Sequence, residues 1–275
     1  VTERVGKNIR TVNPETGESK ILYTFNNAFA DPQHEGVLGL ALSPDFLSGK
    51  GKNYVYAAYT YKNDKDEEFA RIIRLTYDKK SNKLTNETVI LDKLPGSNDH
   101  NSGRLIFGPD KKLYYTIGDQ GHNQGKNLKK LNEAQRTATA EEVAKKDFSS
   151  YPGSTLRINI DGSIPKDNPV INGVRSHIYT YGHRNAQGLV FAGDNLFSTE
   201  HGPSSDDELN LLEAGGNYDW PNVAGFKDDL AYEYVNNFDN GKTYKESEFT
   251  ASNFKEPLKT FFTVQKNYNF KNEQC

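Results

Sequence analysis

The chain has 275 residues, of which 26% are charged and 35% are apolar, and its formal net charge is -3. This balance argues against a nucleic-acid-binding protein, which would normally carry a basic stripe, and gives no reason to expect an anionic membrane as partner. No apolar run approaches the roughly 18 residues that a transmembrane segment needs. Because all-β folds often reach this length as one domain, we predict a single domain over residues 1–275.

Short strand-like runs separated by turn residues recur along the whole chain. Clear examples are 53–60, 112–117 and 156–160, the last followed by the turn signal Asp161-Gly162. Aromatic residues make up 12% of the chain and are mostly Tyr and Phe, which suits strands on half-buried sheets. These patterns predict an all-β fold.

One stretch, 139–146, predicts a helix instead. Thr139 has the side chain of an N-cap residue, and Glu142 lies three positions later, where a capping box requires an acidic or amide side chain. We therefore expect this helix to begin directly after Thr139.

Two sequence elements repeat in step along the chain. The first occupies 40–45, 105–110 and 189–194, and the second begins at Arg10, Arg74 and Arg157. The first recurs after 65 and then 84 residues, the second after 64 and then 83. Matching intervals indicate a repeated unit of strands and long loops, which is typical of β-propeller blades, and an insertion around 124–150 explains the longer second interval. The alternative is a β-sandwich with coincidental similarity between strands.

The chain holds about four blades' worth of sequence, if one blade takes about 65 residues. A four-bladed ring is uncommon, so we expect an incomplete larger ring whose sequence is cut at both ends. The start at Val1 and the complete lack of Met agree with this expectation. The single cysteine, Cys275, is the last residue, and it is either an unpaired thiol or half of a disulfide whose partner lies beyond it.

Polar residues crowd without periodicity into five segments, which are the candidates for a functional site. They are 98–104, 118–124, 181–188, 200–208 and 215–226. For the first, second and fourth, the alternative is a solvated surface loop or turn. For the fifth, which holds the only tryptophan, Trp220, the alternative is plain aromatic packing.

Each candidate segment offers a different chemistry. His100, in a loop bounded by glycine, has the right pKa range to accept a proton near neutral pH, and Asp119 at a strand's end could orient it. Arg184 beside Asn185 could hold a flat anionic ligand, because a guanidinium bonds carboxylates and stacks on rings. The carboxylates of 200–208 suit Ca²⁺, although the pattern of an EF-hand is absent.

Several common catalytic motifs are absent from the sequence. We find no G-x-S-x-G elbow, P-loop, H-E-x-x-H or cysteine pair, and no G-x-G-x-x-G after a strand. An oxidoreductase with this sequence would therefore use a cofactor other than a nicotinamide in a Rossmann site.

In this order, the segments resemble the soluble PQQ-dependent glucose (aldose sugar) dehydrogenases, a glucose/sorbosone dehydrogenase-like family of quinoproteins. The resemblance covers essentially the whole chain, and it is carried by several runs in register. They are 99–104 (Asp-His-Asn-Ser-Gly-Arg), 114–121 (Tyr-Tyr-Thr-Ile-Gly-Asp-Gln-Gly), 161–169 (Asp-Gly-Ser-Ile-Pro-Lys-Asp-Asn-Pro), 182–185 (Gly-His-Arg-Asn), 205–208 (Ser-Asp-Asp-Glu) and 215–218 (Gly-Gly-Asn-Tyr).

The resemblance implies a six-bladed β-propeller enzyme of the extracytoplasmic space, whether periplasmic, secreted or at the cell surface. It implies oxidation of an aldose at C1 to the lactone, with hydride transfer to PQQ and an external electron acceptor. It also implies Ca²⁺ as a second cofactor and a homodimer, with neither nucleic acid nor a transmembrane segment involved.

The resemblance also implies residue roles. By this likeness His100 is the general base, Asp119 orients it, and Arg184 and Asn185 contact PQQ. Backbone carbonyls of Gly202 and Pro203 would bind the calcium ion that holds PQQ. The residues similar to one structural calcium site are Asp207, Glu208 and Tyr218, those similar to a second are Ala224, Phe226, Asp228 and Glu246, and those similar to the sugar pocket are His34, Asp99 and Gln124.

Two departures from the family pattern are visible. His34 stands at a sugar-pocket position where the family often has Gln, which bears on the preference for glucose. The family's sequence also continues past Cys275 with a Lys and Arg residues that bind PQQ, an aromatic wall of the sugar pocket and a disulfide partner for Cys275. We therefore expect this chain by itself to be inactive even where the whole enzyme is active.

Two other functions fit the same residues less well. A sugar-binding propeller without a redox role would bind calcium but not PQQ, and it need not keep His100, Asp119 and Arg184 together. A calcium-dependent hydrolase such as a lactonase would need a metal with carboxylate ligands at the channel and no quinone. A dye-reduction assay and a lactone-hydrolysis assay separate these possibilities.

Overall fold

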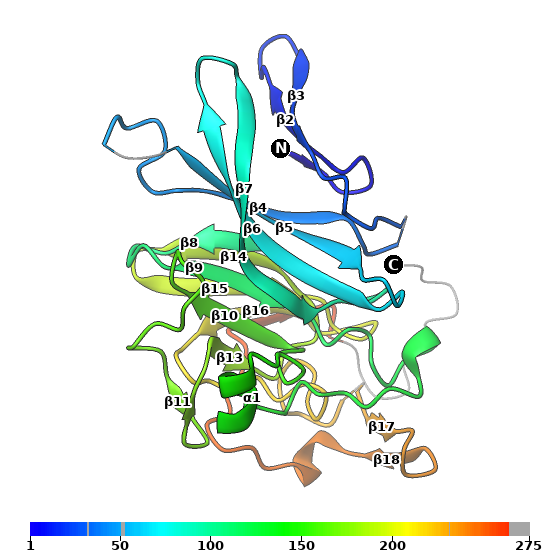
Figure 1. The fold of residues 1–275 in the computed structure, drawn as a ribbon. Helices are drawn as coiled ribbons and strands as arrows, with labels where there is room; N and C mark the ends of the chain where they lie inside the picture. Colours follow the sequence, from blue (N-terminus) through cyan, green and yellow to red (C-terminus); the bar gives the residue numbers. More distant parts are fainter. Residues whose placement is uncertain (32, 51–52, 231, 264–275) are drawn as a thin grey trace.

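The structure, a computed structural model, describes residues 1–31, 33–50, 53–230 and 232–263. Its strands form four antiparallel sheets that follow one another along the chain, from the N-terminal sheet in blue to the last sheet in yellow and orange (Figure 1). The first strands of successive sheets contact one another, β1 with β4, β4 with β8 and β8 with β14. This is the blade arrangement of a β-propeller, so the predicted all-β propeller fold is confirmed.

The sheets and helices have the following bounds. The first sheet contains β1 (Thr2–Glu3), β2 (Asn8–Val12) and β3 (Ser19–Thr24). The second contains β4 (Val37–Leu42), β5 (Tyr54–Lys62), β6 (Glu68–Asp78) and β7 (Lys83–Pro95). The third contains β8 (Leu105–Phe107), β9 (Leu113–Ile117), β10 (Ser154–Ile158) and β13 (Ile178–Tyr181). The fourth contains β14 (Ala186–Ala192), β15 (Asn195–Glu200), β16 (Asp207–Leu212) and β19 (Lys259–Phe261).

Short elements decorate the loops between these strands. They are the two-stranded ribbons β11 (Val170–Ile171) with β12 (Val174–Arg175) and β17 (Tyr234–Asn236) with β18 (Lys242–Tyr244), the helix α1 (Ala140–Lys145), and the 3₁₀ turns η1 (Gly125–Asn127) and η2 (Glu246–Glu248). None of the described helices is long and apolar enough to cross a membrane.

Apolar side chains fill the spaces between consecutive sheets. Ile9 and Val55 belong to a cluster between the first two sheets, and Ile72 and Leu156 to one between the second and third. A third cluster, which includes Leu189, joins the third sheet to the fourth. Since a sheet buried on both faces needs apolar residues at successive positions, β5 and β9 are buried almost throughout.

The internal repeat corresponds to structure. The first element falls on β4, β8 and β14, each the first strand of a four-stranded sheet, together with the turn that follows. The second element begins in β2, β6 and β10, and β6 and β10 are the third strands of their four-stranded sheets. The sequence periodicity therefore marked equivalent strands of successive blades.

The predicted insertion is a long excursion between β9 and β10. Residues 118–153 contain η1 and α1 and no strand. Thr139 caps α1 and Glu142 completes the capping box, as predicted. The excursion folds back toward the end of the third sheet, because the Gly153 N–H donates to the Gly118 carbonyl at 2.9 Å. Cys275 lies outside the described residues.

Packing between the blades predicts an unequal response to side-chain truncation. Leu156 is fully buried between the second and third sheets, so Leu156→Ala should lower the free energy of unfolding by about 2–5 kcal/mol. Val190, on β14, is 58% exposed, and Val190→Ala should change it by less than about 0.5 kcal/mol. Urea denaturation of both variants measures the difference, and equal losses would contradict the packing described.

Candidate active site

His100 lies in a tight, buried turn just before the third sheet. Its side chain is largely buried, and its backbone has a φ of 42°. A histidine in this left-handed region stores strain that its surroundings must offset. The His100 carbonyl packs so closely on Gly118, the residue after β9, that a Cβ at Gly118 would lie 2.0 Å from it. Glycine at position 118 therefore allows the turn to sit against the strand's end.

The His100 imidazole is held by a fully buried carboxylate. Its Nδ1 lies 2.7 Å from Oδ1 of Asp119, which is 0% exposed. The same oxygen accepts the Gly121 N–H at 2.9 Å. Since the carboxylate is an acceptor, Nδ1 carries the proton in the neutral ring, and the lone pair lies on Nε2. The predicted pairing of His100 with Asp119 is therefore present, with Nε2 left as the basic atom.

The second oxygen of Asp119 has two further donors. Asn132 Nδ2 donates to Oδ2 at 3.0 Å, and Trp220 Nε1 donates to it at 2.7 Å. Asn132 comes from the excursion between β9 and β10, and Trp220 from the loop after β16. Four donors thus converge on one carboxylate and fix its position.

Arg184 lies close to this pair through Gln124. Its Nη2 donates to Gln124 Oε1 at 3.4 Å, and Gln124 Nε2 lies 3.1 Å from His100 Nδ1. Its Nη1 donates to the carbonyl of His201 at 3.2 Å. The Arg184 carbonyl accepts the Asp119 N–H at 2.8 Å. The structure therefore brings the predicted catalytic residues together, with Gln124 between them.

Glu200, which was not predicted, holds the Arg184-Asn185 turn. One of its carboxylate oxygens accepts the N–H groups of Arg184 and Asn185, and the other lies 2.9 Å from His183 Nδ1. The Asn185 side chain accepts the N–H and hydroxyl of Ser102, both at 3.1 Å. This last contact ties the turn to the loop that carries His100.

Two of the three predicted sugar-pocket residues, His34 and Asp99, border His100, whereas the third, Gln124, lies between His100 and Arg184. Asp99 Oδ1 accepts the His100 N–H at 2.9 Å and lies 3.3 Å from His34 Nε2. The rings of His34 and His100 are 6.1 Å apart between centroids. Burial lowers the pKa of His34, while the nearby Asp99 carboxylate acts in the opposite direction. His34 is therefore a neutral hydrogen-bonding group beside His100 at neutral pH.

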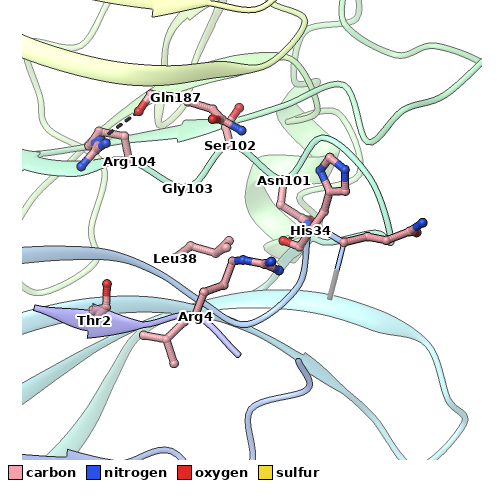
Figure 2. A pocket seen from close by; sticks show the side chains of 11 residues that line it. Thr2, Arg4, His34, Leu38, Asn101, Ser102, Gly103, Arg104 and Gln187 are labelled. Carbon is pink, nitrogen blue, oxygen red and sulfur yellow. Dashed lines mark hydrogen bonds between the residues drawn. The ribbon is translucent and has the colours of Figure 1, made fainter. Parts of the chain in front are cut away.

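A cavity of about 330 Å³ opens next to these residues. Its lining runs from β1 past His34 and Leu38 to Arg104 and Gln187, as Figure 2 shows. The lining residues include two arginines and no Asp or Glu. Arg104 Nε donates to the Gln187 carbonyl at 2.9 Å (Figure 2). A cavity with this lining favours an anionic ligand.

Gly202 and Pro203 follow β15 in a compact turn near Arg184. A Cβ at Gly202 would lie 1.8 Å from the Ser205 carbonyl oxygen, so the turn requires glycine. The Gly202 N–H donates to Asp207 Oδ1 at 2.9 Å. Pro203 lines a small cavity together with Gln124 and Trp220. The predicted calcium-binding carbonyls therefore lie in the same region as the His100–Asp119 pair.

Glu208 is directly opposite Glu200 on neighbouring strands. Its carboxylate accepts the Asn210 side-chain amide at 2.8 Å and the Gly225 N–H at 2.7 Å. Burial, and then the charges of Glu200 and Asp206, raise the pKa of Glu208 to about 8. Two opposed carboxylates repel one another, so this position favours a cation.

Glu246 lies at the centre of the residues predicted for the second structural calcium site. Its carboxylate accepts the N–H groups of Ala224, Asp228 and Asp229 at 3.0, 3.2 and 2.9 Å. Burial raises the pKa of Glu246 to about 7. Phe226 lies within the loop that these bonds close. The residues of this set are thus brought together through backbone contacts.

Tyr218, which was predicted to share a calcium site with Asp207 and Glu208, makes contacts of a different kind. Its ring stacks on His183 with centroids 4.6 Å apart, and its hydroxyl donates to the Leu211 carbonyl. Asp207 contacts Gly202 instead. In the part of the chain that the structure describes, no three His, Cys, Asp or Glu side chains form a group able to hold a metal ion. The calcium ligand sets stay predictions.

Three contributors to the site were missed from sequence. Asn132 and Glu200 occupy segments without a recognisable motif, although Glu200 begins a polar candidate segment. Trp220 lies in the fifth candidate segment, but no role was predicted for it, and plain aromatic packing was the alternative for that segment. Its N–H could have been suspected, because a buried indole usually finds an acceptor.

The sheets, the His–Asp pair and the neighbouring arginine define the class of β-propeller proteins that includes the PQQ-dependent sugar dehydrogenases. The chain belongs to the Glucose / Sorbosone dehydrogenase family, whose model matches residues 1–262. The family resemblance inferred from the sequence motifs is therefore confirmed.

Individual relatives support this assignment. Quinoprotein glucose dehydrogenase B of Acinetobacter calcoaceticus is 47% identical over 100% of the chain, and aldose sugar dehydrogenase YliI of Escherichia coli is 28% identical over 70% of it. The PQQ-bound aldose sugar dehydrogenase of Streptomyces coelicolor superposes with a TM-score of 0.70 and 30% identity over 95% of the chain.

The chain spans only part of each of these relatives. It covers 62% of the Acinetobacter protein, 49% of the Escherichia protein and 64% of the Streptomyces chain. That residues 1–275 form a single propeller domain stays a prediction.

Proposed function

We propose that this protein is a quinoprotein oxidoreductase that oxidises an aldose at C1 to the lactone with PQQ. The observation that carries the proposal is the buried His100–Asp119 pair, with Gln124 lying between His100 and Arg184. A paired base beside an arginine suits the removal of a hydroxyl proton next to an anionic electron acceptor. The names of the relatives, glucose and aldose sugar dehydrogenases, support the same chemistry.

His100 is the group that takes the proton. Its Nδ1–H donates to Asp119, so Nε2 accepts the proton of the C1 hydroxyl. The Asp119 charge then stabilises the imidazolium that forms, as a buried carboxylate does for a neighbouring positive group. His34 and Asp99 lie beside the ring and would bond the sugar's other hydroxyls.

The residues present fit PQQ, which is a flat tricarboxylate. Arg184 Nε is buried and has no hydrogen-bond partner among the described residues. An unpaired buried guanidinium N–H is costly unless a ligand accepts from it. We assign Arg184 and Asn185 to holding the cofactor, which when bound supplies the acceptor for the C1 hydride.

Calcium is the second proposed cofactor. Gly202 and Pro203 would offer backbone carbonyls to the ion that holds PQQ, in a turn that already contacts Asp207. A cation near Glu208 would offset its repulsion with Glu200, and oxygen ligands of this kind suit Ca²⁺. Glu246 with Ala224, Phe226 and Asp228 forms the proposed second structural site.

Further parts of the proposal rest on the family alone. They are an external electron acceptor, an extracytoplasmic location and a homodimer. Measurements of reduction of a soluble dye by aldoses, hydrolysis of lactones and oligomeric state would test them and separate the enzyme from a calcium-dependent hydrolase.

The cofactor site predicts saturable, calcium-dependent binding of PQQ to the 275-residue chain, followed by absorbance and reversed by a chelator. Arg184→Gln should weaken binding by about tenfold or more, because it removes a charge-assisted contact. Arg175→Gln, on β12, is the matched control and should leave binding unchanged. A folded chain that does not bind PQQ would count against the Arg184 and Gly202 elements being a sufficient site.

The role of His100 predicts a selective loss of turnover in the whole enzyme loaded with PQQ and calcium. His100→Ala should reduce the chemical step by about 10²-fold or more, as loss of a general base does. PQQ affinity should change little, because Arg184 and Asn185 remain. Single-turnover reduction of the cofactor by an aldose measures the step, and an unchanged rate would remove His100 from the mechanism.

The opposed carboxylates predict a calcium-dependent stability. Calcium at about 100 times its Kd should raise the melting temperature by about 5 °C, and Glu208→Gln should abolish most of this rise. Glu213→Gln, which changes an exposed carboxylate paired with Lys255, should keep it. Scanning calorimetry with calcium and with chelator measures the shift, and an equal rise in both variants would exclude Glu208 as a ligand.

A further inference from the structure

Trp220 contacts two parts of the proposed site with one side chain. Its indole N–H donates to Asp119 Oδ2 at 2.7 Å. The face of its ring lies under the Arg184 guanidinium, whose Cζ is 5.4 Å from the ring centroid. That distance is within the range of a cation–π contact. The N–H and the ring face therefore contact the orienting acid and the cofactor-binding arginine separately.

The N–H bond to Asp119 constrains the plane of the carboxylate. A carboxylate held only through Oδ1, by His100 and Gly121, could still turn about its Cβ–Cγ bond. Donors on Oδ2 from Trp220 and Asn132 remove that freedom. The orientation of the His100 ring, and hence the direction of its Nε2 lone pair, follows from the fixed carboxylate.

Trp220 is itself held firmly in place. Its backbone N–H donates to the Gly182 carbonyl at 2.9 Å, and its carbonyl accepts Gln135 Nε2 at 2.8 Å. Its ring packs against Tyr232, with centroids 5.5 Å apart, and against Ala134. The side chain is 8% exposed. A rigidly held indole can transmit its position to both partners.

We propose that Trp220 is a positioning residue that couples the His100–Asp119 pair to Arg184. Its N–H fixes the orientation of the Asp119 carboxylate, which in turn orients His100. Its ring face fixes the position of the Arg184 guanidinium relative to this pair. Its effect on turnover rests on the proposed function, whereas the coupling itself is a property of the cofactor-free chain. The two can therefore be tested separately.

The first test uses a substitution that removes the contact of Trp220 with Asp119 and keeps its contact with Arg184. Trp220→Phe keeps an aromatic face for Arg184 and removes the donor to Asp119. In the whole enzyme, loaded with PQQ and calcium, it should lower kcat by about tenfold, with KM for the aldose and the Kd for PQQ changed by less than about threefold. Asn132→Leu, which removes the other donor to Oδ2, should lower kcat in the same way. An unchanged kcat in Trp220→Phe would overturn the proposal.

The second test needs neither cofactor nor turnover. Trp220 is the only tryptophan, so its indole N–H gives a single resonance in a ¹H–¹⁵N spectrum. Protonation of His100 changes the charge that Asp119 faces, so this resonance should move with pH. In His100→Gln that movement should disappear.

Other titratable groups around Trp220 require a control. The charged or titratable groups in contact with the indole or facing Asp119 and His100 are Arg184, Tyr232, His122, His34, Asp99 and the chain neighbour Asp219. Burial lowers the pKa of His122, whose imidazole acts on Asp119 only through space. His122→Gln is therefore the matched control and should leave the movement of the resonance intact.

The outcomes separate the coupling from the enzyme activity. A resonance that moves in the wild type and in His122→Gln, but not in His100→Gln, supports the coupling even if the loaded protein oxidises no sugar. A resonance that ignores pH, or that still moves in His100→Gln, overturns it. Because this measurement uses wild-type protein, it decides the matter even if Trp220→Phe does not fold.

Discussion

A carboxylate removed from water must find donors within the protein, and the buried Asp119 draws them from three parts of the chain. His100 comes from the loop before β8, Gly121 and Asn132 come from the long excursion between β9 and β10, and Trp220 comes from the loop after β16. Because an unsatisfied buried carboxylate is very unfavourable, these segments must meet for the chain to fold. The same contacts that supply the buried carboxylate with donors therefore also fix the geometry of the proposed base.

The blades supply the frame for that convergence. Apolar clusters between consecutive sheets fix the third and fourth sheets relative to each other, and the ends of their strands carry His100 and Arg184. Glycines at 118 and 202 let the backbone approach closely where the loops cross. The apolar core therefore sets the distances between the site residues of the two sheets, and the loops supply the polar side chains of the site.

Much of the fold was predictable from the sequence, because blades repeat. Leu40, Leu105 and Leu189 begin equivalent elements, and their spacing identified the propeller without a structure. Thr139 and Glu142 likewise predicted α1, because a capping box acts through local bonds.

The site was predictable only where short motifs or the family resemblance marked it. His100, Asp119 and Arg184 were found in this way, and the structure brings them together. Asn132 and Trp220 act across 13 and 101 positions of the sequence from Asp119. Contacts between residues so far apart in the sequence depend on how the loops cross in space, and no local pattern of residues encodes that crossing.

The proposed site spans the seam between two blades. His100 and Asp119 belong to loops of the third sheet. Arg184 belongs to the connection into the fourth sheet, Glu200 ends its strand β15, and Trp220 lies in the loop after β16. Gln124 bridges the seam with contacts of 3.1 and 3.4 Å. A small slide of one blade against the other would break these contacts while both sheets stayed intact. Small relative motions of the two blades would therefore disrupt the proposed catalytic arrangement without unfolding either sheet.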